Sequence, residues 1–246
     1  MPAIIPTLDE AAIQYRSAAQ VVMTLYARRR PNAGQQVTPD SLNQAIEQFF
    51  AISNQLERDA SGSGTAVYKD EVSRLGDYAI TLLADLAAWA GQLGLTEAKQ
   101  DMEATTLSIA DWVMRHEGEL RTLDPVVNAA AERANRTKDA RSLEGLCEFI
   151  GRALDAASKP IKQDLEKTNP GRPWRVLHIN RGIVATRTHN PKLMEQVFDD
   201  LVRALPEDAS HFFAEGMQQM SALNYPAHVR AVMSRYFDQW TRKTMH

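Results

Sequence analysis

The sequence predicts an all-α protein of about ten helices. Over most of the chain, apolar residues recur at alternating intervals of three and four, which is the period of an amphipathic helix. Several of these apolar stripes begin after a threonine, asparagine or aspartate that is followed by proline, a combination typical of a helix start. No run of alternating apolar and polar residues lies between turn signals, as a half-buried strand would require.

Four long helices are expected in the first 120 residues. Thr7 and Glu10 have the spacing of a capping box, and Thr38 precedes a proline at the first helical position of the next helix. A hydrophilic linker, Ser-Gly-Ser-Gly at 61–64, then interrupts the pattern. The third stripe has seven apolar positions and is the strongest periodic signal in the chain. The expected helices cover residues 7–30, 38–56, 72–93 and 96–113.

Six shorter helices are expected between residues 121 and 246. Asp124 and Asn190 each precede a proline and are predicted to start helices. Pro160 is predicted to end or bend the helix before it, and the stretch 169–173 is a turn by composition. The expected helices cover residues 124–134, 143–154, 174–188, 190–205, 206–223 and 226–243.

The short connections predict how these helices are arranged. Ten antiparallel helices cannot all surround one axis, so we expect neighbouring helix pairs to stack into a curved layer, an α-α superhelix. The four long helices of residues 1–120 and the six shorter ones of residues 121–246 would then be continuous as one domain. The alternative is a four-helix bundle followed by a separate six-helix domain.

Two glycines in the last third of the chain suggest a repeat. Gly182 and Gly216 are 34 residues apart, and each follows a ring-bearing side chain by four residues, His178 and Phe212 respectively. The first unit closes at Pro206. Over residues 174–240 this pattern resembles the tetratricopeptide repeat, in which glycine lets the two helices of a repeat approach closely.

The resemblance is one of architecture. Arg181 and Ala185 stand where that family prefers leucine and tyrosine. Because tetratricopeptide proteins present a concave groove to peptides or partner helices, the resemblance implies a binding role for the C-terminal third.

Composition excludes several classes of protein. The net charge of -3 argues against a surface that binds nucleic acid or anionic lipid over its whole extent. The single cysteine, Cys147, rules out an intramolecular disulfide and a multi-cysteine zinc site, and it fits a reducing compartment. No secretory leader and no apolar stretch of membrane-spanning length are found. We therefore expect a cytoplasmic protein.

Charge is distributed unevenly along the chain. Residues 159–192, here called the basic segment, hold eight basic and two acidic side chains. Arginines in such a segment can form forked hydrogen bonds to planar anions, which predicts a recognition surface. The alternative is a solvated stretch balanced by the acidic first half of the chain. The candidate partner-binding residues are Lys159, Lys162, Arg172, Arg175, His178, Arg181, Arg187 and Lys192.

No catalytic or metal-binding motif is found. Phosphate-binding glycine loops, the Gly-x-Ser-x-Gly elbow and paired Glu-x-x-His motifs are all missing from the sequence, and no cofactor is implied. We therefore expect a non-catalytic helical-repeat scaffold or adaptor that binds a partner protein or an acidic peptide. A homodimer is compatible with this expectation. The alternative is an RNA- or nucleotide-binding protein that uses the same basic segment. For the scaffold, replacing Arg175, Arg181 and Arg187 with glutamate should abolish partner binding and leave stability nearly unchanged. The RNA alternative instead predicts a steep salt dependence of binding to an oligonucleotide.

Overall fold

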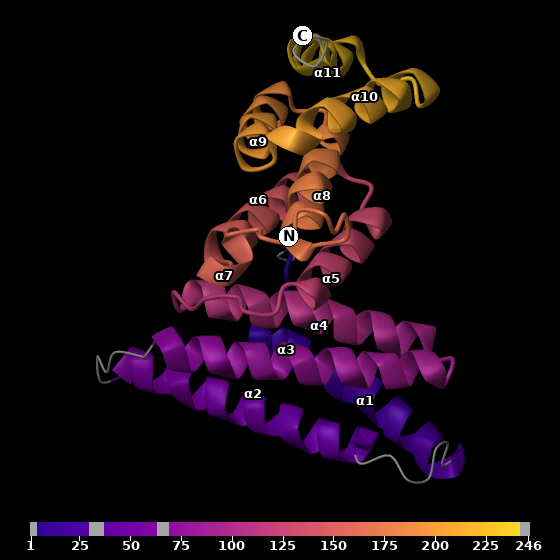
Figure 1. Cartoon of the computed structure of the whole chain (residues 1–246). Helices are drawn as coiled ribbons and strands as arrows, with labels where there is room; N and C mark the ends of the chain where they lie inside the picture. The colour runs from indigo at the N-terminus through magenta and orange to yellow at the C-terminus, as the bar shows by residue number, and fades with distance from the viewer. Residues whose placement is uncertain (1–3, 30–36, 63–68, 242–246) are drawn as a thin grey trace. The chain divides into compact units, whose positions relative to one another are not determined.

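The computed structural model describes residues 4–29, 37–62 and 69–241, and over these residues it contains eleven helices and no strand (Figure 1). The predicted all-α class and the packing of neighbouring helices in pairs are confirmed. The helix that was not predicted is a single turn that carries Pro160 within its first two residues, where proline is tolerated. The helices are α1 Leu8–Arg29, α2 Pro39–Gly62, α3 Lys69–Gln92, α4 Thr96–Arg115, α5 Asp124–Arg136, α6 Ala140–Ala156, α7 Lys159–Lys162, α8 Pro173–Arg187, α9 Pro191–Ala204, α10 Pro206–Ala222 and α11 Ala227–Thr241.

The helix starts follow the predicted caps. The Thr7 amide donates to Glu10 Oε2 (2.8 Å) and the Glu10 amide donates to Thr7 Oγ1 (3.3 Å), which completes the capping box. Asn190 accepts the amide of Leu193 in the same way (3.3 Å). Of the predicted 61–64 linker, the first two residues belong to α2 and the other two lie outside the described residues, as does residue 30, the predicted end of the first helix.

The chain divides into two compact units. The N-terminal unit comprises residues 1–133 and 155–162, and the C-terminal unit comprises residues 134–154 and 163–246. The predicted division at residue 120 therefore lies inside the N-terminal unit. The backbone explains why, because the Leu120 amide donates to Ala156 (2.8 Å) and the Ser158 amide donates to Leu120 (2.9 Å). These bonds and the buried apolar face of α5 hold residues 120–133 in this unit.

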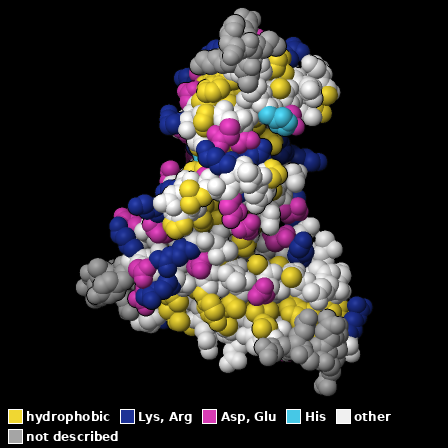
Figure 2. Space-filling model, in the orientation of Figure 1, with side chains coloured by type: hydrophobic (Ala, Val, Ile, Leu, Met, Phe, Trp, Pro, Cys, Tyr) yellow, Lys and Arg dark blue, Asp and Glu magenta, His cyan; other side chains and the backbone are white. Residues whose placement is uncertain are grey.

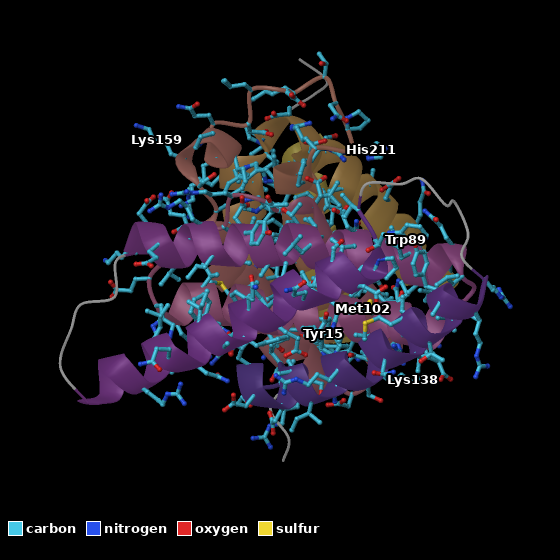
Figure 3. The ribbon with its side chains drawn as sticks, turned by 90° about the horizontal axis from the view of Figure 1, so that it is seen from below. Tyr15, Trp89, Met102, Lys138, Lys159 and His211 are labelled. Atoms are coloured by element: carbon cyan, nitrogen blue, oxygen red, sulfur yellow. The ribbon has the colours of Figure 1, made fainter. Side chains whose placement is uncertain are left out.

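In the N-terminal unit, the four long helices form a four-helix bundle. Helix α1 packs against α2 and α4, and α3 packs against the same two helices, so the four contacts close a ring. Tyr15 and Met102 point into the bundle interior (Figure 3), where Phe49 and Trp112 meet edge to face at 5.5 Å. Helix α4 is the most enclosed of the four, because every residue from 105 to 110 is buried.

In the C-terminal unit, α8 packs against α9 and α10 packs against α11. Helices α8 and α10 run parallel to each other. Near their first turns Arg175 contacts Asp208 at 2.7 Å, and just beyond their last turns the rings of His189 and Tyr225 lie 5.3 Å apart. This arrangement places the first helices of the two pairs side by side.

Close contacts between these helices require the two glycines that the repeat pattern identified. A Cβ atom at Gly182 would lie 2.6 Å from Phe212 on α10 and 3.2 Å from Leu201 on α9. At Gly216 it would lie 2.6 Å from Met233 on α11. Both distances to the nearest neighbour are shorter than van der Waals contact, so a larger residue would force the neighbouring side chain to shift: a buried aromatic ring at Gly182, and the flexible end of Met233 at Gly216.

We expect Gly182→Ala to destabilise the protein by about 1–3 kcal/mol, because the added methyl group overpacks the contact with Phe212. Gly91→Ala is the matched control, since its Cβ would meet only the Lys99 side chain at 3.8 Å on the exposed side of α3. That variant should be neutral or up to about 1 kcal/mol more stable. Urea unfolding followed by circular dichroism measures both, and equal stabilities would contradict the close-packing explanation.

Candidate partner-binding site

The structure separates the eight candidate residues of the basic segment. Lys159 and Lys162 lie on α7, in the N-terminal unit, and both are exposed; Lys159 projects outward from its helix (Figure 3). Arg172 and the residues after it belong to the C-terminal unit. Arg172 is the N-cap of α8, four further candidates lie on α8 itself, and Lys192 is exposed at the start of α9. The lysines therefore face solvent, and the arginines cluster around α8.

Arg172 is a buried structural residue. Its side chain is only 6% exposed, and its Nε donates to Asp164 Oδ1 at 2.6 Å. Its Nη1 donates to the carbonyl oxygens of Lys167 and Asn169, both at 3.1 Å. The guanidinium group thus holds together the turn that precedes α8.

Arg175 connects α8 to α10. Its Nη2 lies 2.7 Å from Asp208 Oδ1, and its Nη1 donates to the carbonyl oxygen of Pro170 at 2.9 Å. Asp208 stands in the first turn of α10, where its carboxylate also stabilises the helix N-terminus. The ion pair therefore fixes the beginnings of the two parallel helices to each other.

Arg181 and Arg187 also bind oxygen atoms of the C-terminal unit. Arg181 Nη1 donates to Asp200 Oδ2 on α9 at 2.9 Å. Arg187 donates to the carbonyl oxygens of Ala134 (2.9 Å), in the last turn of α5, and Thr137 (2.8 Å), just after that helix. All four arginines of the basic segment thus have internal partners.

These contacts favour a structural role for the arginines. The carboxylates that balance them come from Asp164 in the turn before α8 and from Asp200 and Asp208 on α9 and α10, and not from the first half of the chain. Replacing Arg175, Arg181 and Arg187 with glutamate is therefore expected to destabilise the C-terminal unit, whereas the sequence alone led us to expect little change.

His178 is buried among these groups. Its ring packs edge to face on Trp174, with 4.7 Å between centroids. Burial, and to a smaller extent the positive charge of Arg181, lowers the pKa of His178 to about 4. Within the described part of the chain, His178 Nε2, Arg172 Nη2 and Asp164 Oδ2 are buried without a hydrogen-bond partner. His178 cannot contact a partner protein without a rearrangement of α8.

Neither an accessible thiol nor a metal-binding cluster is found among the described residues of this site. Cys147 is buried and free, and burial raises the pKa of its thiol to about 11, so it is a packing residue. Among the residues that the structure describes, no three His, Cys, Asp or Glu side chains are placed to hold a metal ion.

An apolar groove is lined by residues of α8 that include Arg187. It runs between α8 and α10 and has a volume of about 440 Å³. Ile183 on α8 and Leu223 at the end of α10 are 47% and 63% exposed at its borders. Its apolar lining consists of Ile179, Ile183, Phe212, Met220, Leu223 and Met233.

The polar border of this groove carries few charges. Glu215 is exposed and lies 3.7 Å from His211, and the guanidinium of Arg187 is already bound to two carbonyls. The groove was not predicted from the sequence. The available signal was Ile179 and Ile183, one helical turn apart and off the buried stripe of Leu177 and Val184.

The known proteins give no assignment for this chain. No family model matches the sequence, and neither the curated proteins nor the solved structures contain a match. Among the described helices, none combines the length and the apolar character needed to cross a membrane. Function must therefore be argued from the site itself.

The depressed pKa of His178 predicts a pH-dependent stability. The folded unit keeps the imidazole neutral down to pH 4, whereas the unfolded chain binds a proton near pH 6.5. Acidification from pH 7 to pH 5 therefore favours unfolding, by about 2 kcal/mol from this residue alone. We expect His178→Gln to lose correspondingly less stability over this interval in urea unfolding.

His211→Gln is the control for this measurement, because His211 is exposed on α10 of the same unit. It should leave the pH dependence unchanged. A His178→Gln protein that loses as much stability between pH 7 and pH 5 as the unmodified protein would show that His178 is not held neutral.

Proposed function

We propose that the protein is a non-catalytic scaffold that binds an amphipathic helix of a partner protein in the groove between α8 and α10. The observation that carries this proposal is the pair of exposed apolar side chains, Ile183 and Leu223, on the two borders of an apolar groove. Large apolar side chains that converge on a concave surface are typical of a protein-binding site. The reducing compartment that the lone buried Cys147 fits is consistent with a cytoplasmic scaffold.

The shape of the groove favours a helical occupant. Ile179 and Ile183 form one border on α8, and Phe212, Gly216 and Leu223 follow one another along the facing side of α10. Two parallel helices separated in this way accept the apolar face of a third helix, whose anchors recur at intervals of three, four and seven residues. Gly216 contributes no side chain, and Met233 of α11 packs against it to form part of the lining.

The charges on the border of the groove indicate which charge the partner helix should carry. Glu215 is the exposed carboxylate on the border, and the neighbouring Arg187 is occupied by backbone carbonyls. A lysine or arginine beside the apolar face of the partner would pair with Glu215. We therefore propose an apolar helix with a basic flank, in place of the acidic peptide that the basic segment suggested.

Two further points support a protein ligand over RNA. Nucleic-acid binding by the basic segment would need free guanidinium groups, and Arg172, Arg175, Arg181 and Arg187 are all bound within the C-terminal unit. The tetratricopeptide resemblance implies a groove for peptides or partner helices. The α8–α10 groove lies between the first helices of the two proposed repeat units.

The test uses phage-displayed random peptides of about 16 residues, which form about four helical turns, selected on the intact protein. We expect the selected peptides to share apolar residues at helical spacing and at least one lysine or arginine. Ile183→Glu and Leu223→Glu should each weaken binding of the best peptide by about tenfold or more, because they place a charge on the apolar border. Glu215→Gln should weaken it less and make it insensitive to salt, because it removes the charge pair without creating a repulsion.

Ile13→Glu is the matched control, since Ile13 is an isoleucine of α1 that is 69% exposed in the other unit. It should bind the peptide as the unmodified protein does. Peptides that bind all variants equally would place the site elsewhere. Binding of an oligouridine probe at low salt, with no peptide selected, would favour the RNA alternative.

A further inference from the structure

Two buried polar atoms at the beginnings of α8 and α10 indicate a small binding site. Within the described residues, Arg172 Nη2 and Asp208 Oδ2 are shielded from solvent and have no hydrogen-bond partner. The side chains of Arg172 and Asp208 are only 6% and 15% exposed. A buried charged group that lacks a hydrogen bond is costly, so atoms of this kind point to a bound group that satisfies them.

The distances around Arg172 Nη2 fit one bridging atom. Nη2 lies 3.7 Å from Asp208 Oδ2 and 3.7 Å from Glu207 Oε1. A direct charge-assisted hydrogen bond would be about 2.7–2.9 Å long, so neither contact is one. A single oxygen atom about 2.9 Å from both ends spans such a separation, as bridging water does between polar groups that do not touch.

Other bonds hold these groups apart. Arg172 Nε donates to Asp164 at 2.6 Å, and its Nη1 donates to two backbone carbonyls in the turn before α8. Asp208 Oδ1 is held by Arg175, whose Nε and Nη2 lie 2.8 and 2.7 Å away. The guanidinium of Arg172 and the carboxylate of Asp208 cannot close their separation without breaking these bonds. A third group must therefore satisfy Nη2 and Oδ2.

The balance of charge at the site favours a neutral ligand. On the face that Figure 2 shows, basic and acidic side chains of the C-terminal unit lie next to one another. A bound anion would lie against carboxylates, and a metal ion would lie against a guanidinium group, so each would meet a like charge. Three basic and three acidic residues contact one another at this site: Lys167, Arg172, Arg175, Asp164, Glu207 and Asp208.

We infer that one water molecule is bound between Arg172 Nη2, Asp208 Oδ2 and Glu207 Oε1. It accepts a hydrogen bond from the guanidinium and donates one to each carboxylate, and three partners are usual for a buried water. The water connects the N-cap of α8 to the first turn of α10, beside the direct Arg175–Asp208 pair. None of these residues lines the α8–α10 groove, so the site does not depend on the proposed function.

A crystal structure of the full chain, at a resolution that shows ordered water, tests the site directly. We expect an electron-density peak about 2.7–3.2 Å from Arg172 Nη2 and from both carboxylate oxygens. A direct hydrogen bond between Arg172 Nη2 and Asp208 Oδ2, or a gap without density, would overturn the inference. Ile183→Glu, which alters the groove, should keep the peak.

Oxygen-17 relaxation dispersion of the solvent, which counts long-lived bound waters, tests the site in solution. In Asp208→Glu the longer side chain reaches into the gap and contacts Arg172, so we expect the count to fall by one. Asp200→Glu is the matched control, because its carboxylate oxygens already pair with Arg181 (2.9 Å) and Arg203 (3.0 Å), and its count should not change. A folded Asp208→Glu protein with the count of the unmodified protein would contradict the inference; if that variant does not fold, the crystal structure decides.

Discussion

The pairing of the α8 arginines with oxygen atoms of their own unit is the interaction on which the C-terminal unit depends. A guanidinium group that leaves water must recover its lost hydration through hydrogen bonds and opposite charges. Arg175 does so at Asp208 on α10, Arg181 at Asp200 on α9, and Arg187 at the carbonyls that end α5. These bonds fix the rotation of α8 about its axis, because a turned helix would leave each guanidinium without its partner.

That fixed rotation explains why the groove exists. With the arginines bound to α5, α9 and α10 and with Gly182 against Phe212, Ile179 and Ile183 lie between Arg175 and Arg187 along α8 and line the groove. These side chains cannot turn inward without breaking the ion pairs. The unit therefore exposes apolar surface as a consequence of satisfying its charges, and a partner helix would remove that surface from water.

The fold could be predicted from the sequence further than the site could. Helix periodicity and caps such as Thr7 with Glu10 depend on residues that are close in the chain, so they are visible in the sequence. The close contact at Gly182 was also foreseen, because only glycine permits it. The partners of the arginines were not, since Asp208 lies 33 residues after Arg175 and the charge of a segment says nothing about what faces it in space. For the same reason, the boundary between the units was placed at residue 120, before the backbone bonds that join Leu120 to Ala156 and Ser158.

The most direct test of this account is a double-mutant cycle between Arg175 and Asp208, with the free energy of unfolding measured in urea for the two alanine variants and their combination. Both side chains are largely shielded from solvent, so a structural ion pair predicts a coupling energy of about 1–3 kcal/mol. A coupling below about 0.3 kcal/mol, with each single variant as stable as the unmodified protein, would mean that the arginines of α8 do not hold the unit together and are free to bind a ligand.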